Sequence, residues 1–469
     1  MRTSHPGEAA AGMSSPSWIG ARIDRLPATP YLWKLVILLS LGGWFELYEL
    51  FFTGYIAPGL ISSGVLTSTT QVFLGYTGVA AFIAATFAGL FIGTFFLGLL
   101  PDRFGRRFVF TYALLWYTAA SVVMAFQTSP EGLLAWRFIS GIGLGVEIVT
   151  IDAYLTELVP TGTRGRAFAL NQGIMFTAVP VVALLAWWLV PQAPLGLQGW
   201  RWVVLIGALG AIAVWFIRRE IPESPRWLAQ SGRADEAERV MAAIEARIQT
   251  QYGKPLPPPR PAAADVQLET ASLREIWKPP YRSRLLMLMV FNFAQVIGYY
   301  GFANWVPTLL IEKGIVVTKS LFYSFVIAIA NPVGPLVGMS FADKVERKWV
   351  IVGSAIAIAV IGTAFSQVTA PALLIACGVA MTLVNTTLSY AYHAYQTEVF
   401  PVRVRGRAAG IAYSTSRLGA MCSGFLVSYF LQHFGVGGVF GLITAAMAVV
   451  VVSIGVFGPS VRAKSAGAV

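Results

Sequence analysis

Charged residues are scarce in this chain. Aspartate, glutamate, lysine and arginine make up 12% of its 469 residues, whereas ordinary soluble domains carry roughly 25%. A soluble protein of this length needs a charged surface to stay dispersed, so the composition argues against that class. Cysteine is rarer still: Cys377 and Cys422 both fall in apolar segments, which indicates neither a disulfide framework nor a metal site. No Gly-x-x-x-x-Gly-Lys-Ser/Thr loop occurs, which argues against an ATP-driven pump.

Long apolar runs fill the space between these few charges. Hydrophobic residues make up 56% of the chain, and about twelve runs approach the ~20 residues that a helix needs to cross a bilayer. The first thirty residues are polar, without an apolar core and cleavage site, so no cleaved signal peptide is expected. The sequence predicts an all-α integral membrane protein with twelve transmembrane helices. The predicted spans are 33–58, 77–100, 108–127, 132–159, 167–191, 201–219, 285–310, 319–342, 349–366, 371–399, 408–431 and 436–458.

The basic residues indicate membrane topology. The net charge is +12, but the arginines and lysines lie in short connections between apolar runs rather than in a patch suited to nucleic acid. They concentrate after the even-numbered spans, whereas the opposite side offers Arg201, Lys313 and Lys319. Positively charged loops mark the cytoplasmic side. The pattern predicts a multi-pass protein of a cell membrane, as in a bacterial inner membrane, with both termini cytoplasmic.

Two charged motifs occur twice, and both second copies are displaced by 241 positions. Asp102 in Pro101–Arg107 returns as Asp343 in residues 342–348, and Glu157 of Glu-Leu-Val-Pro returns as Glu398 of Glu-Val-Phe-Pro. One shared displacement of about half the chain indicates a duplicated module. The predicted fold is therefore two pseudo-symmetric six-helix bundles, the architecture of secondary transporters, with a site between them.

Residues 220–284 interrupt the apolar pattern between the two halves. Within them, Arg233–Gln249 has the spacing of an amphipathic helix, and Pro255–Pro261 is a stiff extended stretch. We interpret this linker as a solvated cytoplasmic spacer, with a regulatory domain as the alternative. The predicted parts are an N-terminal segment (1–32), a first bundle (33–219), the linker (220–284), a second bundle (285–458) and a cytoplasmic tail (459–469).

On these motifs the chain resembles the major facilitator superfamily over nearly its whole length. The Asp-Arg-x-Gly-Arg-Arg signature at Asp102, its decayed second copy and the Glu-x-x-Pro…Arg-Gly-Arg pair all match. Pro222–Leu228 resembles a mark shared by sugar porters, organic-ion transporters and bacterial metabolite–proton symporters.

The motifs divide between branches of the superfamily. Ala294-Gln295 stands where sugar porters have paired glutamines, and their Pro-Glu-Thr-Lys-Gly motif is missing after the last span. Asn171-Gln172 is sugar-porter-like, whereas Tyr299–Pro307 looks closer to metabolite symporters, including niacin transporters.

The resemblance gives the repeated charges a role. In the superfamily they are understood as a cytoplasmic latch that locks neighbouring helices in one conformation and releases them in another. Plain interfacial charge is the alternative. The residues assigned to the latch are Asp102, Arg106, Glu157, Arg166, Asp343, Glu398 and Arg407.

Acidic residues inside the predicted spans are candidates for proton coupling, because each costs about 2.5–3.5 kcal/mol to insert. Glu46 and Glu49 lie three positions apart on one helix face and reach the depth of Arg137 in the fourth span. In related proton symporters an acid in the first span works with the arginine that opens Arg-x-x-x-Gly-x-Gly-x-Gly, here Arg137. A static ion pair is the alternative.

Glu147 and Asp152 in the fourth span are also candidates for proton coupling. Their side chains differ in direction by about 140° around the helix, so at most one of them faces a central cavity. Glu147 is the midplane candidate.

The second half contains one unusual cation, Arg417, roughly 15 Å inside the eleventh span. No acid in the second-half spans sits at that depth, and a guanidinium can grip a carboxylate with two hydrogen bonds. We expect an anion site, with pairing to Glu147 across the cavity as the alternative. The full set of predicted substrate-binding residues is Arg417, Gln295, Asn304, Tyr300, Trp305, Tyr299, Tyr48, Tyr392, Gln172 and His393.

These features predict a monomeric secondary active transporter that carries a small aromatic or organic carboxylate, of the nicotinate type, together with protons. The alternatives are a sugar or polyol symporter, an organic-cation transporter, a uniporter and a sensor that binds without transporting. Neither enzymatic activity nor a cofactor is expected, and the predicted partners are the substrate, protons and the lipid bilayer.

Overall fold

A computed structural model of the chain describes residues 16–66, 78–259, 273–341, 345–400 and 402–460. Helices are the only regular secondary structure in these ranges, and eleven of them are long and apolar enough to cross a membrane. The last of these, α21 (Val402–Gly455), reverses at Gly435, whose φ of 62° lies in the region that favours glycine. It therefore supplies two spans, and the predicted twelve-helix fold is confirmed.

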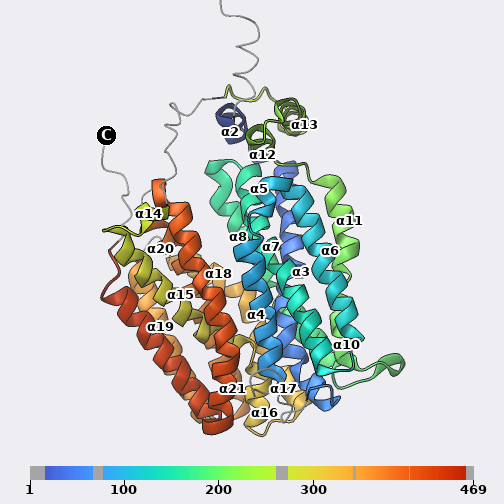
Figure 1. Cartoon of the computed structure of the whole chain (residues 1–469), viewed down its shortest axis with the longest axis vertical. Coiled ribbons are helices and arrows are strands. Elements are labelled where there is room, and N and C mark those ends of the chain that lie inside the picture. The colour runs from blue at the N-terminus through green and yellow to red at the C-terminus, as the bar shows by residue number, and fades with distance from the viewer. Residues whose placement is uncertain (1–15, 67–77, 260–272, 342–344, 401, 461–469) are drawn as a thin grey trace, which may run out of the picture.

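The helices form two bundles (Figure 1). The first contains α3 (Pro30–Ser62), α4 (Gly78–Phe96), α6 (Arg106–Ala125), α7 (Pro130–Leu158), α8 with α9 (Arg164–Phe176 and Ala178–Leu189) and α10 with α11 (Gly199–Gly207 and Gly210–Glu220). The second contains α15 (Tyr281–Ala303), α17 with α18 (Val317–Ala328 and Ala330–Phe341), α19 (Arg347–Gln367), α20 (Pro371–Glu398) and α21. Three short helices connect the longer ones: α5 (Leu100–Phe104) follows α4, α14 (Leu273–Ile276) precedes α15, and α16 (Val306–Glu312) follows α15.

Glycines set the spacing between α4 and α7. A methyl group at Gly93 would lie 2.1 Å from the carbonyl oxygen of Ile142, and one at Gly145 would lie 2.3 Å from that of Leu90. Neither position can accept a side chain, because the two backbones touch there. The glycines of the Arg-x-x-x-Gly-x-Gly-x-Gly motif thus bring α7 against α4 and leave Arg137, at its start, inside the first bundle.

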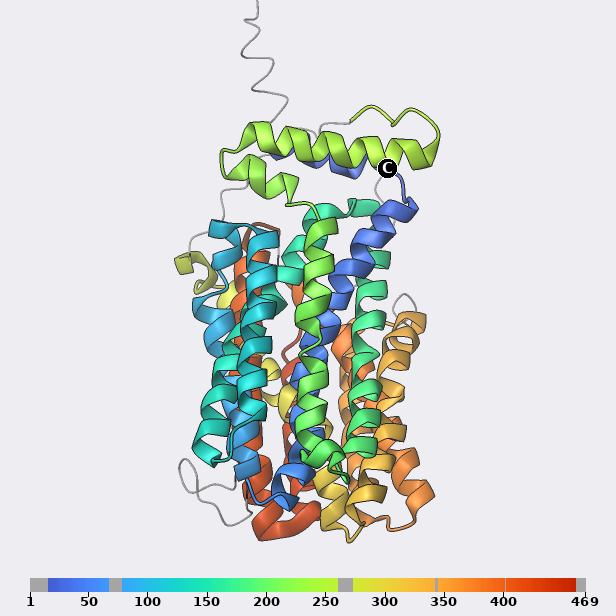
Figure 2. The ribbon, with the colours of Figure 1, turned by 90° about the vertical axis from the view of Figure 1, so that its right-hand side faces the viewer.

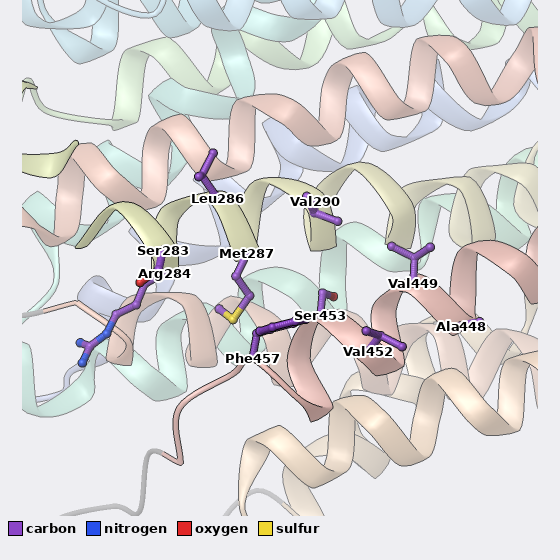
Figure 3. Close-up of a pocket in the computed structure, with 10 residues that line it drawn as sticks. All are labelled: Ser283, Arg284, Leu286, Met287, Val290, Ala448, Val449, Val452, Ser453 and Phe457. Atoms are coloured by element: carbon purple, nitrogen blue, oxygen red, sulfur yellow. The ribbon is translucent and has the colours of Figure 1, made fainter. Parts of the chain in front are cut away.

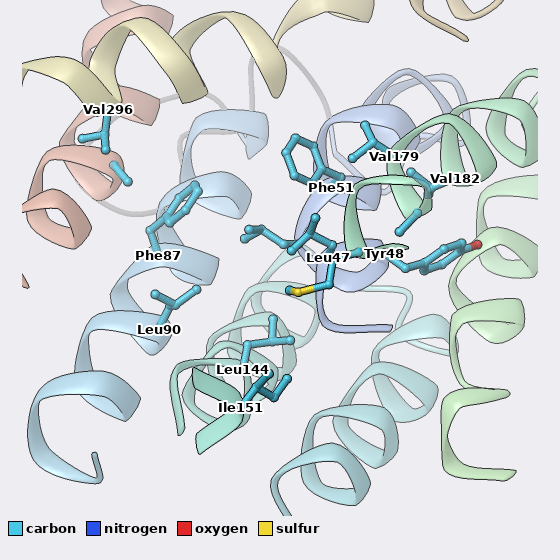
Figure 4. Packing of buried hydrophobic residues seen from close by; sticks show 14 of the residues in the cluster. Leu47, Tyr48, Phe51, Phe87, Leu90, Leu144, Ile151, Val179, Val182 and Val296 are labelled. Atoms are coloured by element: carbon cyan, nitrogen blue, oxygen red, sulfur yellow. The ribbon is translucent and has the colours of Figure 1, made fainter. Parts of the chain in front are cut away.

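The two bundles meet at the end away from the linker helices. A methyl group at Gly54 of α3 would lie 2.3 Å from the backbone oxygen of Asn304, and the Trp187 ring of α9 lies 5.1 Å from that of Phe322 in α17. Nearer the middle, Phe87 and Val296 come from different bundles and belong to one apolar core (Figure 4). Towards the other end the bundles stand apart (Figure 1).

We call that other end the linker end, and three helices cover the first bundle there. The helix expected at Arg233–Gln249 is present as α13 (Ala234–Tyr252) and lies across the end of the first bundle, with α12 (Pro225–Gln230) beside it (Figure 2). The third helix, α2 (Pro16–Asp24), was not anticipated in the N-terminal segment. It packs on α13 and α12 although it is more than two hundred residues away in the chain.

Ion pairs hold α2 to α13. Arg22 Nη2 lies 2.7 Å and Arg25 Nη2 2.6 Å from the Glu245 carboxylate, and Arg22 also pairs with Glu238. Burial opposes ionisation of Glu245, but the hydrogen bonds from Arg22 and Arg25 outweigh it and lower the pKa of this carboxyl below its usual value. The contact therefore stabilises the fold above the usual glutamate pKa and is lost as the pH falls through the lowered one.

Arg22→Ala is expected to release α2 at neutral pH, because charge-assisted bonds of this kind contribute about 1.5–3 kcal/mol. Hydrogen exchange of the backbone amides in residues 16–24 should speed up by roughly ten- to a hundred-fold. Arg239→Ala, whose guanidinium donates to the backbone oxygen of Asp235 on the same helix, is the matched control. Unchanged exchange in Arg22→Ala would show that apolar packing alone holds α2.

Candidate functional site

A buried ion pair lies inside the first bundle. Arg137 Nη1 is 3.3 Å from Glu49 Oε2, and neither side chain has any solvent exposure. The guanidinium also donates to Thr86 Oγ1, at 2.8 Å, and to the backbone oxygen of Glu49, at 2.6 Å, while Ser121 donates to Glu49 Oε2 at 2.7 Å. Of the two acids expected to approach Arg137, Glu49 is the one that does so. The pair is closed off from water, and Glu49 Oε1 has no hydrogen-bond partner among the described residues.

Glu46 is buried one turn away and faces the other bundle. Its carboxylate interacts electrostatically with Asp152 of α7 and with Arg417 of α21, and its Oε2 has no hydrogen-bond partner within the described part of the chain. Glu46 is thus the acid of the first span that borders the space between the bundles. The two glutamates point to different neighbours because only one of them lies beside α7 at the level of Arg137.

The two acids of α7 differ from the expected arrangement. Asp152 is exposed and interacts with Arg417 across the bundle interface. Glu147 is fully buried inside the first bundle, against Gly42 of α3 and beside the hydroxyl of Tyr117 in α6. The expectation that Glu147 is the acid at the central cavity is therefore wrong. Asp152 takes that position because α7, packed on α4 through its glycines, turns Glu147 into the first bundle.

Arg417 lies between aromatic hydroxyls. Its Nη2 donates to the hydroxyl of Tyr413 at 3.0 Å, and its guanidinium carbon lies 4.8 Å from the centre of the same ring. Tyr300 and Tyr392 interact with it electrostatically as well. Among the described residues no carboxylate lies within ion-pair distance, so the guanidinium is buried with phenols as its polar neighbours. The suggested pairing with Glu147 does not occur.

Several other predicted substrate residues surround this arginine. His393 is exposed, its ring stacks on Tyr392 with centres 4.2 Å apart, and it lies 5.6 Å from the ring of Tyr413. Tyr300 stands against Phe87 of the first bundle, with ring centres 4.6 Å apart. Both bundles therefore contribute to the same site.

The remaining candidates are more scattered. Gln295 is buried in α15 and Gln172 is partly buried in α8. Asn304 and Trp305 are buried near the closed end, where the amide of Asn304 and the indole nitrogen of Trp305 have no partner within the described residues. Tyr48 is misplaced in the prediction: it is fully buried and donates to the backbone oxygen of Val203, at 2.7 Å, inside the first bundle (Figure 4).

Sequence reasoning missed some polar residues at the bundle interface. A cavity of about 20 Å³ lies between the bundles, and Tyr299 lines it together with Asn331, Thr382 and Asn385. Tyr413 was also missed, although its position four residues before Arg417 on one helix face is a signal that could have found it. The three interface residues carry no charge, and amides and hydroxyls within apolar helices are common helix–helix contacts.

The repeated charges form a cluster at the linker end. Arg106 Nη2 lies 2.8 Å from Glu157 and 2.7 Å from Asp102, and the Glu223 carboxylate accepts the backbone N–H groups of Arg106 and Arg107 at the start of α6. Arg166 lies outside this cluster with an exposed side chain. The whole cluster belongs to the first bundle and its linker helices.

The second copy of the motif is built differently. Glu398 pairs with Arg347 at the start of α19. Arg407 is exposed on α21, and Asp343 lies outside the described residues. In the second copy, the structure therefore describes the pair of Glu398 with Arg347, and Arg347 takes the position that Arg106 has in the first bundle.

Two six-helix bundles with buried charges between them define a membrane transporter of the major facilitator superfamily. The chain belongs to the family described as "Sugar (and other) transporter", which matches residues 35–465. It is a multi-pass membrane protein that transports a small molecule and is not an enzyme.

Named relatives cover nearly the whole chain. The niacin transporter NiaP of Acinetobacter baylyi is 28% identical over 95% of this chain and 98% of its own length. The inner membrane metabolite transport protein YdjE of Escherichia coli is 29% identical over 95% of this chain and 97% of its own. The partially occluded, inward-open xylose transporter XylE of Escherichia coli superposes with a TM-score of 0.73, at 18% identity, over 93% of this chain and 100% of that one; this likeness concerns the fold.

Proposed function

We propose that the protein is a symporter that carries a small organic carboxylate, of the nicotinate type, together with protons. The observation that carries the substrate class is Arg417. It is buried between the bundles and surrounded by aromatic rings, and its hydrogen-bond partner is a phenol. Among the described residues no carboxylate lies within ion-pair distance of it, and Glu46 and Asp152 interact with it at longer range. A buried guanidinium of this kind favours an anion with a flat apolar body. The niacin transporter among the relatives supports the same class.

Proton coupling is assigned to the two acids of the first span, Glu49 and Glu46. Glu49 is paired with Arg137, whereas Glu46 lies nearby and interacts electrostatically with both Asp152 and Arg417. A substrate carboxylate at Arg417 would compete with Glu46 for the same positive charge. We propose that binding of the anion favours protonation of Glu46, because an unpaired carboxylate in a closed site is costly.

The proposed orientation places the linker end in the cytoplasm of a bacterial cell, with both termini on that side. Arginines are concentrated there, as the positive-inside rule requires. The bundles touch at the opposite end and stand apart at the linker end (Figure 1). The conformation would then face inward, and transport would require the linker end to close while the other end opens.

The proposal is tested with purified protein in liposomes. Uptake of nicotinate, nicotinamide, benzoate, xylose and a quaternary amine is measured with and without an inward proton gradient. We expect the carboxylates to accumulate only with the gradient, and nicotinamide to be a poor substrate. Xylose is the second candidate substrate, favoured by Asn171-Gln172, which resembles sugar porters. Its accumulation in preference to the acids would contradict the assignment.

Asp102→Asn is expected to weaken the proposed latch and shift the protein away from the outward-open state. The Asp102 side chain is 66% exposed, and exposed ion pairs contribute about 0.2–1 kcal/mol, so the ratio of states should change by at most about five-fold. Labelling of single cysteines placed at the outer mouth measures the change. Lys254→Gln removes an exposed linker charge as a control, and identical labelling in all three proteins would count against the latch.

A further inference from the structure

A second cavity lies on the outside of the second bundle, away from the transport site. Its volume is about 570 Å³, and it runs between the first half of α15 and the end of α21 (Figure 3). Arg284 and Ser283 lie at one end of the row of lining side chains, and Val290, Val449 and Ala448 lie towards the other. None of the residues around Arg417 contributes to it.

The walls of this groove are apolar and exposed. Val290 is 49%, Val452 51% and Phe457 70% exposed, although all three belong to or adjoin helices that cross the membrane. Side chains in such positions face the hydrocarbon of the bilayer. From Arg284 to Val290 the helix rises by roughly 9 Å, which stays within the ~15 Å depth of one leaflet. The groove therefore matches part of one acyl chain.

The polar end of the groove lies where a lipid headgroup would be. Arg284 and Ser283 sit in the first turn of α15, and Arg284 Nη1 donates to the backbone oxygen of Val399 at 2.9 Å. No carboxylate among the described residues lies within ion-pair distance of Arg284. Lys278 and Arg282 do not line the groove, but both are exposed close to Arg284 in the chain, so three cations lie around the start of α15.

We propose that this groove binds one phospholipid with an anionic headgroup. One acyl chain lies along Val290, Val449 and Val452, and the phosphate contacts Arg284, with the positive charges of Lys278 and Arg282 close by. Basic clusters at the cytoplasmic end of a transmembrane helix recognise anionic lipids in this way. Trp277 is exposed next to Lys278, and aromatic side chains are enriched at the membrane–water interface, where the headgroup would lie. The proposal does not rest on the transported substrate.

Native mass spectrometry of the full chain in detergent provides the test. The protein is incubated with equal amounts of dioleoyl phosphatidylglycerol and dioleoyl phosphatidylcholine, which differ in headgroup charge. We expect one bound lipid per chain and at least a ten-fold preference for phosphatidylglycerol. Lys278→Gln with Arg282→Gln, both exposed and therefore tolerant of change, should reduce the preference to less than three-fold, and adding Arg284→Gln should abolish it. Arg218→Gln, which removes an exposed cation at the same end of α11, is the control and should change nothing.

A groove-filling substitution tests whether an acyl chain occupies the groove or whether the basic residues alone attract the lipid. Ala448→Leu should lower the occupancy of both lipids at least five-fold, with the thermal midpoint of the detergent-purified protein retained. Equal binding of the two lipids by the wild type, or unchanged occupancy in Ala448→Leu, would overturn the proposal. Light scattering is measured in parallel: if Ala448→Leu converts a dimer into a monomer, the groove is a contact between copies of this chain and the lipid assignment is wrong.

Discussion

Glu49→Gln is expected to abolish accumulation driven by a proton gradient while exchange of substrate across the membrane continues. Glu49 is the acid in contact with Arg137, and both side chains are fully buried. A glutamine keeps the shape of the side chain but can neither release nor accept the proton. An inward gradient of one pH unit supports about ten-fold accumulation for a one-proton symporter, so the ratio should fall from about ten to one. Uptake and counterflow in proteoliposomes measure the two activities.

The controls separate loss of coupling from loss of fold. Removing one partner of a buried pair costs about 3–5 kcal/mol, so the thermal midpoint of Glu49→Gln is measured as well. The double variant Glu49→Gln with Arg137→Gln removes both charges and should recover stability without recovering accumulation. Glu131→Gln changes an exposed acid at the start of α7 and should behave as the wild type. Accumulation that persists in both Glu49 variants would exclude this pair from coupling and leave Glu46 as the candidate.

Arg417→Ala is expected to erase the preference for nicotinate over nicotinamide, which differ by the carboxylate. Loss of a charge-assisted contact should weaken nicotinate binding by about 1.5–3 kcal/mol, or roughly ten- to a hundred-fold. Nicotinamide binding should change little. Arg417→Lys should restore only part of the affinity, because an ammonium cannot reproduce the planar fork of the guanidinium. Binding is measured by thermal shift and by isothermal titration with the purified protein.

Tyr413→Phe supplies a matched test of the surroundings of Arg417. It keeps the aromatic ring and removes the hydroxyl that accepts from Arg417 Nη2. We expect a smaller loss, of about 0.5–1.5 kcal/mol, with the preference for the acid retained. If the wild type binds both compounds equally, or binds a sugar more tightly than any acid, Arg417 has a structural role and the carboxylate assignment fails.

The fold could be predicted from patterns that are readable along the chain. Apolar runs of membrane length, the alternation of charged connections and one shared displacement of 241 positions lead to twelve helices in two bundles. The helix expected at Arg233–Gln249 was visible for the same reason, since amphipathic spacing is a property of consecutive residues. The docking of α2 was not, because the partners of Arg22 and Arg25 lie more than two hundred positions away.

The sequence by itself determined the inventory of the site: intramembrane acids in the first half, Arg417 in the second, and aromatic residues beside both. Only the tertiary structure decided which of these residues meet. Glu49 rather than Glu46 reaches Arg137, Asp152 rather than Glu147 borders the interface, and Tyr48 turns into the first bundle. The physical reason is that the sequence sets the relative directions of side chains on one helix, whereas close packing, as at Gly93 and Gly145, sets the rotation of each helix against its neighbours.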